Sequence, residues 1–194
     1  ASEVDVLVVL LRKLDLKLAS ASIPLLERMV DELLRWNPRR NLTAITDRDE
    51  VLEKHLVDSL TLLPFARQST RLLDIGSGAG FPALPLKIVC PELEVVSVDA
   101  VGKKIDFQRH VVRTLGLQGF TALHARIETL TDYHAGFDLV TARALCSLVD
   151  LVALAEPFLA PGGRLVAMKG PEGGREFSEQ QEPLKQAGWS AVLH

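Results

Sequence analysis

Hydrophobic positions in the first third of the chain recur every three or four residues. Two such runs fill residues 3–37, and a polar break at residues 20–24 separates them. Because this spacing puts the apolar side chains on one face of a helix, it predicts two amphipathic helices, the second ended by Pro38. A third helix with the same spacing is predicted to end at Pro64. Residues 1–68 are therefore expected to form a helical extension.

From residue 70 onward, short apolar runs rich in β-branched residues alternate with helical stretches. Strands are predicted at residues 71–75, 94–99, 119–124, 137–142, 163–169 and 189–193. Helices are predicted at 82–90, 102–115, about 126–130 and 147–158, with a turn at 161–163 and a loop at 170–174. Strands that alternate with helices predict an α/β fold with a mostly parallel sheet covered on both faces. We expect residues 69–194 to form one compact unit.

Three glycines follow an acidic residue where the first predicted strand ends. Residues 74–80 read Asp-Ile-Gly-Ser-Gly-Ala-Gly, and a second acid, Asp99, ends the next strand 23 residues after Gly76. Glycine lets a ligand approach the backbone closely, and an acid at about that distance reaches a ribose hydroxyl in doubly wound folds. The pair predicts a nucleoside-containing ligand above the carboxyl ends of two neighbouring strands.

The spacing of this loop differs from the dinucleotide fingerprint. Counted from Gly76, the third glycine would fall at Phe81, and only the looser Gly/Ala form, counted from Gly78, reaches Ala83. Pro82 removes an amide donor near the helix start, where a pyrophosphate needs donors. No Gly-Lys-Ser/Thr follows, which excludes a Walker loop. The segment instead resembles motif I of class I S-adenosylmethionine-dependent methyltransferases, the alternative being an ordinary tight turn.

Composition and charge limit the class of protein. Hydrophobic residues make up 47% and charged residues 24% of the 194 residues, the balance of an ordinary globular protein. Two cysteines, Cys90 and Cys146, are too few for a disulfide framework or a zinc site, so we expect no metal and a reducing cytoplasm. The short apolar run at 6–11 predicts neither a signal peptide nor a membrane span. A net charge of −3 argues against a strongly basic RNA-coating protein.

Further segments carry a more specific resemblance. In chain order they are Trp36-Asn37, Asn41-Leu42-Thr43, His55-x-x-Asp58-Ser59, the glycine loop with Phe81-Pro82, Ala142-Arg143-Ala144 and Met168-Lys169-Gly170. Together they resemble the bacterial RsmG family (glucose-inhibited division protein B) over roughly residues 30–190. The resemblance implies a Rossmann-like class I fold, S-adenosylmethionine as cofactor, and methylation of guanine N7 in small-subunit (16S) ribosomal RNA. The resemblance also implies that the partner is this RNA or the ribosomal small subunit. We infer no obligate protein partner.

The motif spacing and the resemblance together indicate candidate cofactor-binding residues. These are Asp74, Gly76, Ser77, Gly78, Gly80, Phe81, Asp99, Ala100, Ile127, Glu128 and Arg143. The resemblance places Gly76 and Phe81 where the family's loop contacts the cofactor, and Ile127 with Glu128 in its adenine-side segment. Arg143 matches the family's arginine after the fourth strand and is the candidate catalytic residue.

The chemistry implied by the resemblance requires positioning rather than deprotonation. Guanine N7 carries an in-plane lone pair and no proton, so no general base is needed, and orientation can supply roughly 7–11 kcal/mol. Consistent with this, residues 141–144 lack the Asp/Asn-Pro-Pro-Tyr/Phe segment of many amino-group methyltransferases. Arg143 is expected to contact guanine O6, a phosphate or the cofactor carboxylate, and a structural salt bridge is the alternative.

Substrate RNA is expected to contact a second set of residues. Its candidates are Arg39, Arg40, Asn41 and Lys169, although Asn41 also suits a helix cap and Lys169 a solvated surface. His55, Asp58 and Ser59 share one predicted helical face, and we expect them to pack this helix against the cofactor loop rather than to form a catalytic triad. The rival functions are a small-molecule methyltransferase and a non-enzymatic, cofactor-binding RNA adaptor.

The end of the chain departs from the usual class I pattern. These enzymes usually finish with a hairpin whose last strand inserts antiparallel beside the fifth. The chain stops at Val192-Leu193-His194, within the predicted sixth strand, so the final strand is expected to be missing. Because an exposed sheet edge is a liability, this pattern is typical of a truncated chain.

Overall fold

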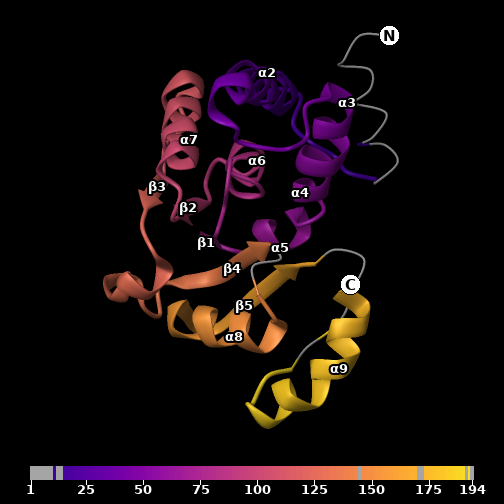
Figure 1. The fold of residues 1–194 in the computed structure, drawn as a ribbon, viewed down its shortest axis with the longest axis vertical. Helices are drawn as coiled ribbons and strands as arrows, with labels where there is room; N and C mark the ends of the chain where they lie inside the picture. Colours follow the sequence, from indigo (N-terminus) through magenta and orange to yellow (C-terminus); the bar gives the residue numbers. More distant parts are fainter. Residues whose placement is uncertain (1–10, 12–14, 144–145, 170–172, 191, 193–194) are drawn as a thin grey trace.

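A five-stranded parallel sheet forms the centre of the computed structural model, which describes residues 11, 15–143, 146–169, 173–190 and 192 (Figure 1). The strands are β1 (Arg71–Ile75), β2 (Glu94–Asp99), β3 (Phe120–His124), β4 (Phe137–Arg143) and β5 (Leu159–Met168). Their order is β3-β2-β1-β4-β5, and every pairing is parallel. This arrangement confirms the predicted Rossmann-like class.

Helices occupy both faces of the sheet and the N-terminal third of the chain. They are α2 (Ser22–Arg40), α3 (Arg48–Val51), the π-helix η1 (Leu52–Val57), α4 (Asp58–Leu60), α5 (Leu63–Arg67), α6 (Ala83–Val89), α7 (Gly102–Leu115), α8 (Leu148–Ala155) and α9 (Gly173–Gln186). Three short 3₁₀ turns are η2 (Ile127–Thr129), η3 (Thr131–Tyr133) and η4 (Glu156–Phe158). In Figure 1, α6 and α7 lie on one side of the sheet, while α8 and α9 lie on the other. No helix in this described part of the chain is long and apolar enough to cross a membrane.

Both faces of β1 are buried, which explains its nearly continuous apolar sequence. Leu72 packs with α5 and α6, whereas Leu73 packs with α8 on the opposite face. Successive side chains of a strand point to opposite faces, so a strand covered on both sides needs apolar residues at consecutive positions. The helical extension packs on the helices that cover the sheet, because Leu26 and Leu33 of α2 share a hydrophobic core with Phe107 of α7.

Two prolines have roles that differ from the predicted ones. Pro38 does not end α2, which continues to Arg40, where Asn41 caps it in the left-handed region at φ 48°. A proline in the last turn removes only one donor, so the remaining turn still forms. Pro64 lies in the first turn of α5 instead of ending the preceding helix, since a residue in the first helical turn needs no intrahelical donor.

The C-terminal third contains the largest corrections. β5 begins at Leu159 instead of 163, and the predicted turn at 161–163 lies inside it beside a shift in its register with β4. The helix α9 was not predicted, because its apolar residues are few among glutamates and glutamines. The predicted strand at 189–193 is absent at Trp189, Ser190 and Val192, and its other residues lie outside the described ones.

The described residues therefore contain five strands and no final antiparallel strand. At the other end of the chain, residues 16–18 are not helical, although the first predicted helix includes them. Apart from Leu11, the earlier part of that predicted helix lies outside the described residues.

Candidate functional site

The glycine loop leads from β1 into α6 and takes backbone conformations that favour glycine. Gly76, Gly78 and Gly80 have φ angles of 66°, 58° and 104°. A Cβ on Gly80 would lie 2.4 Å from the Cδ1 atom of Leu84, so that glycine allows the loop to pack on α6. A Cβ on Gly78 would meet no heavy atom within 4 Å. Gly78 therefore borders open space, which a ligand can approach closely.

Asp99 lies directly beside this loop, as the spacing of the two strands predicts. Its Oδ2 atom accepts a hydrogen bond of 2.8 Å from the amide of Gly78, and its Oδ1 accepts one of 2.8 Å from the amide of Val101. The parallel register of β1 and β2 brings the two strand ends together at Ile75 and Val98. The structure thus joins the loop and the second acid at one carboxyl edge of the sheet.

Asp74 is completely buried under the loop. Its two carboxyl oxygens accept hydrogen bonds from the Thr141 hydroxyl at 3.1 Å and from the amide of Ala83 at 3.2 Å. Burial raises the pKa of Asp74 to about 8, against the opposing effect of these two hydrogen bonds. Its observed contacts hold the start of α6 against β4 and brace the loop, while contact with the cofactor amine stays a prediction.

Arg143 ends β4 at the same edge and faces the helical extension. Its Nη2 atom lies 3.4 Å from Oδ2 of Asp58, and 27% of its side chain is exposed. Burial and, to a smaller extent, the charge of Arg143 lower the pKa of His55 to about 4. The ion pair that was the structural alternative for Arg143 is therefore present, but it is long and partly exposed.

His55 connects the helical extension to the loop by stacking on Phe81. Their ring centroids are 5.0 Å apart at an angle of 18°. The Nε2 atom of His55 lies 2.8 Å from the hydroxyl of Thr43, and the hydroxyl of Ser59 donates to the backbone oxygen of His55. The geometry confirms a packing role and excludes a Ser-His-Asp triad, because the Ser59 hydroxyl is already hydrogen-bonded within its own helix.

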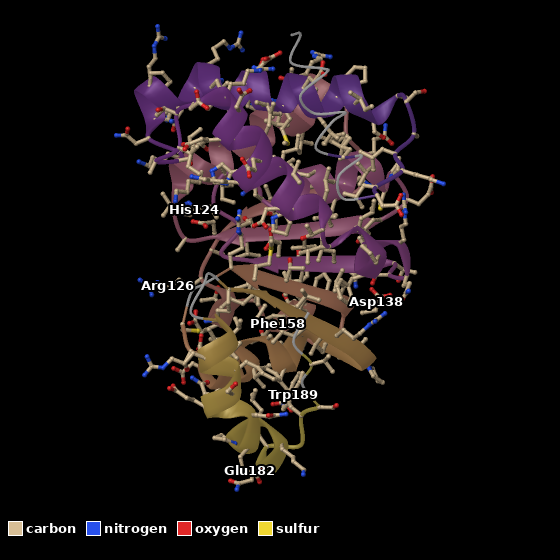
Figure 2. The ribbon with its side chains drawn as sticks, turned by 90° about the vertical axis from the view of Figure 1, so that its right-hand side faces the viewer. His124, Arg126, Asp138, Phe158, Glu182 and Trp189 are labelled. Atoms are coloured by element: carbon tan, nitrogen blue, oxygen red, sulfur yellow. The ribbon has the colours of Figure 1, made fainter. Side chains whose placement is uncertain are left out.

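The adenine-side candidates follow β3, the strand next to β2. Asp99 is opposite His124 in the register, and the Nε2 atom of His124 lies 3.0 Å from the backbone oxygen of the exposed Ala100. Ile127 is buried and Glu128 is exposed on the turn η2. In Figure 2, His124 and Asp138 lie at opposite ends of the sheet's strands, because His124 ends β3 and Asp138 lies near the start of β4. These candidates therefore lie at the carboxyl edge with Asp99.

The candidate RNA residues belong to two separate elements. Arg39 and Arg40 are exposed at the end of α2, in a groove of about 760 Å³ that Arg35, Trp36 and Pro38 also line. Asn41 is the left-handed cap of α2. At the end of β5, the ammonium group of Lys169 lies 3.2 Å from Glu176 and also donates to the backbone oxygen of Cys146. Lys169 is therefore paired in this structure.

Comparison with known proteins identifies the family. A family model described as GidB, rRNA small subunit methyltransferase G, matches residues 22–191. The chain belongs to the GidB family. A protein of Syntrophotalea carbinolica named ribosomal RNA small subunit methyltransferase G is 53% identical over 173 residues, which are 87% of this chain and 80% of that protein. One with the same name from Geobacter sp. strain M21 is 51% identical over 91% of this chain and 82% of the relative.

Solved structures support the fold of this GidB chain. A SAM-dependent methyltransferase from Aquifex aeolicus is similar with a TM-score of 0.57 over 74% of this chain and 85% of that one, at 20% identity. As a member of the family, the chain is an S-adenosylmethionine-dependent methyltransferase, which confirms the cofactor class expected from the loop. The residues present fit this cofactor, because Gly78 borders open space and the carboxylate of Asp99 lies beside it.

Sequence reasoning missed one buried polar residue of the GidB site. Gln108 of α7 is fully buried and donates from its side-chain amide to the hydroxyl of Ser77 at 2.8 Å and to the backbone oxygen of Gly78 at 2.7 Å. The sequence contains a signal for this residue, because Gln108 lies three residues from both Ile105 and Val111 and so falls on the apolar face of the predicted helix. A lone polar residue on such a face must find partners, and here they belong to the loop.

Proposed function

We propose that this GidB-family enzyme methylates N7 of a guanine in small-subunit ribosomal RNA. The observation that carries the proposal is Arg143, which ends β4 at the same edge of the sheet as the loop, near two groups that are poorly suited to abstract a proton. The pKa of His55 is lowered to about 4, and Asp74 is fully buried. Guanine N7 needs no deprotonation, so such a site suits it. The names of the curated relatives support small-subunit RNA as the substrate class.

The residues of the chain would bind and orient the two reactants. Bound S-adenosylmethionine supplies an electrophilic methyl group on a sulfonium. The backbone of Gly76, Gly78 and Phe81 would enclose its methionine end, and Asp99 would hold its ribose. Arg143 would exchange its long ion pair for guanine O6, which leaves N7 free to attack in line with the methyl group.

Basic residues outside the cofactor site would hold the RNA backbone. Within the described ranges, Arg39 and Arg40 form no ion pair with an acidic side chain, so their charges are available to phosphate. Lys169 would have to leave Glu176 to reach a phosphate. If these residues bind phosphates, RNA affinity falls steeply with added salt, whereas affinity that hardly changes with salt contradicts the footprint.

The two cysteines weigh against methylation at cytosine C5. Burial raises the pKa of the Cys90 thiol. Burial raises the pKa of Cys146, which disfavours the thiolate that methylation at cytosine C5 requires.

Labelled S-adenosylmethionine tests the proposal directly. The enzyme is incubated with naked ribosomal RNA and with small subunits from cells that lack it, and the modified nucleoside is identified. Label on guanine N7 supports the proposal. Label confined to metabolites supports the small-molecule rival, and cofactor binding without any transfer supports the adaptor.

The substitution Arg143→Ala tests the assigned catalytic residue. We expect methyl transfer to be lost while the fold persists, because Arg143 is partly exposed at a strand end. Arg164→Ala is the matched control, since Arg164 lies on the neighbouring strand β5 and contacts Gln68 and Phe65. Near-normal turnover of Arg143→Ala would contradict the assignment.

A further inference from the structure

Gln108 lies at the centre of a buried hydrogen-bond network under the glycine loop. Its Oε1 atom accepts a 2.7 Å hydrogen bond from the hydroxyl of Ser97 on β2, and its Nε2 atom donates to Ser77 and Gly78. The hydroxyl and the amide of Ser77 in turn both donate to the backbone oxygen of Val98. Gln108, Ser97 and Ser77 are all buried, so water is excluded from the bonds among these three side chains, while the bond to Gly78 is partly buried.

The chemistry of the partners determines the orientation of the Gln108 amide. A backbone oxygen can only accept, so the group that faces Gly78 must be the NH₂. The second NH₂ proton then goes to Ser77, and the amide oxygen accepts from Ser97. Each polar side-chain atom of Gln108 has a partner of the complementary kind, and a fully satisfied buried network of this sort specifies one conformation.

The peptide groups of Gly78 are held on both sides. Asp99 accepts from its amide at 2.8 Å, while Gln108 donates to its carbonyl oxygen at 2.7 Å. Gly78 is the loop residue that borders open space, and its φ of 58° is one of several conformations open to glycine. Without both partners, the loop would have to be ordered when the cofactor binds, which lowers affinity.

We propose that Gln108 is a positioning residue for the cofactor, which holds the Gly78 carbonyl and thereby presets the loop for S-adenosylmethionine. This inference rests on the cofactor site proposed above. Gln108 itself touches no reactant, and it acts through Gly78 and Ser77. The loop is thus set by two elements, β2 through Asp99 and α7 through Gln108.

The substitution Gln108→Glu replaces the donor with an acceptor of nearly the same shape. The ionised carboxylate of this variant would repel the Gly78 oxygen, whereas its protonated form can donate to that oxygen. Calorimetric titration with S-adenosylmethionine is therefore made at pH 6 and pH 8.5 for both proteins. We expect the variant to bind at least about ten-fold more weakly than the wild type at the higher pH, with a smaller deficit at the lower one.

A second pair of variants separates positioning from packing. Gln108→Leu leaves the Ser97 hydroxyl without its acceptor, and the additional change Ser97→Val removes that hydroxyl. The double variant is expected to recover stability, because both partners are replaced, but not cofactor affinity, because Gly78 is still released. Val111→Ala, three residues along the same helix and also buried, removes no hydrogen bond and is the control for general destabilisation.

These measurements distinguish a positioning role of Gln108 from a role in packing alone. Recovery of full affinity in the double variant would assign Gln108 to packing and overturn the inference. If the wild type itself binds no S-adenosylmethionine, the proposed cofactor site fails instead. A deficit in cofactor affinity with an unchanged KM for RNA supports the positioning role.

Discussion

At the scale of single residues, two aspartates at neighbouring strand ends have different environments. Asp99 is half-buried and accepts two backbone amides at the edge of the open space near Gly78. Asp74 is fully enclosed, and burial raises its pKa to about 8. Both positions were predicted from the glycine loop, but only burial distinguishes a carboxylate that can meet a ligand from one that supports the loop.

The buried carboxyl of Asp74 predicts a pH dependence of stability. Because its pKa is raised from 3.8 to about 8, the folded state binds the proton more tightly than the unfolded chain. The free energy of unfolding therefore falls as the pH rises from about 4 to about 8, by up to about 1.4 kcal/mol per pH unit. Asp74→Asn resembles the neutral form and should remove this fall.

Urea unfolding of the wild type and Asp74→Asn at pH 5 and pH 7.5 measures the effect. We expect the variant to gain stability relative to the wild type at the higher pH. Asp106→Asn, an exposed change on α7, is the control. Equal pH slopes in the wild type and Asp74→Asn would contradict a neutral Asp74.

At the scale of elements, the site is a strand–loop–helix unit whose glycines have separate roles. Gly80 allows the close approach of Leu84 on α6, whereas Gly78 turns the chain at the edge of open space. Gly116 ends α7 with a φ of 64°, and a Cβ there would also meet nothing within 4 Å. Gly78 and Gly116 are therefore matched in backbone conformation and in free space, but only Gly78 belongs to the loop.

This match provides a controlled test of the loop. Gly78→Ala and Gly116→Ala should each destabilise the protein by about 1 kcal/mol, because both force alanine into the left-handed region. Only Gly78→Ala should weaken S-adenosylmethionine binding, by about ten-fold or more, since its methyl group would occupy ligand space. Calorimetry and thermal unfolding of both variants distinguish the two effects, and equal cofactor affinities would refute the assigned approach to Gly78.

At the scale of the whole molecule, the helical extension packs against α7, the glycine loop and the end of β4. Leu33 of α2 and Leu56 of η1 belong to one core with Phe107 of α7. The stacking of His55 on Phe81 and the ion pair between Asp58 and Arg143 join the extension to the site itself. The boundary near residue 68 stays a prediction about sequence organisation, and these contacts indicate that the two parts fold together.

A fragment that contains only residues 69–194 tests this dependence. We expect it to lack a cooperative unfolding transition, because removal of α2 and η1 exposes the apolar faces of α6 and α7. Circular dichroism and urea unfolding against the complete chain provide the measurement. A fragment that unfolds cooperatively and binds S-adenosylmethionine would show that the extension is dispensable for the fold.

The sequence by itself determined the features that depend on local pattern. The bounds of β1, β2 and α7, the left-handed glycines and the pairing of the loop with Asp99 follow from apolar periodicity, turn chemistry and parallel strand ends. The family resemblance also followed from short segments, and the comparisons confirm it.

Only the tertiary structure decided which side chains meet across elements. The network of Gln108, the pairing of Lys169 with Glu176 and the stacking of His55 join residues that lie on different elements, so no local pattern contains them. The helix α9 and the absence of a strand at Trp189 and Ser190 have a related cause. This region has few apolar residues, so its local pattern does not distinguish a helix from a strand. Packing against α8 favours the helix.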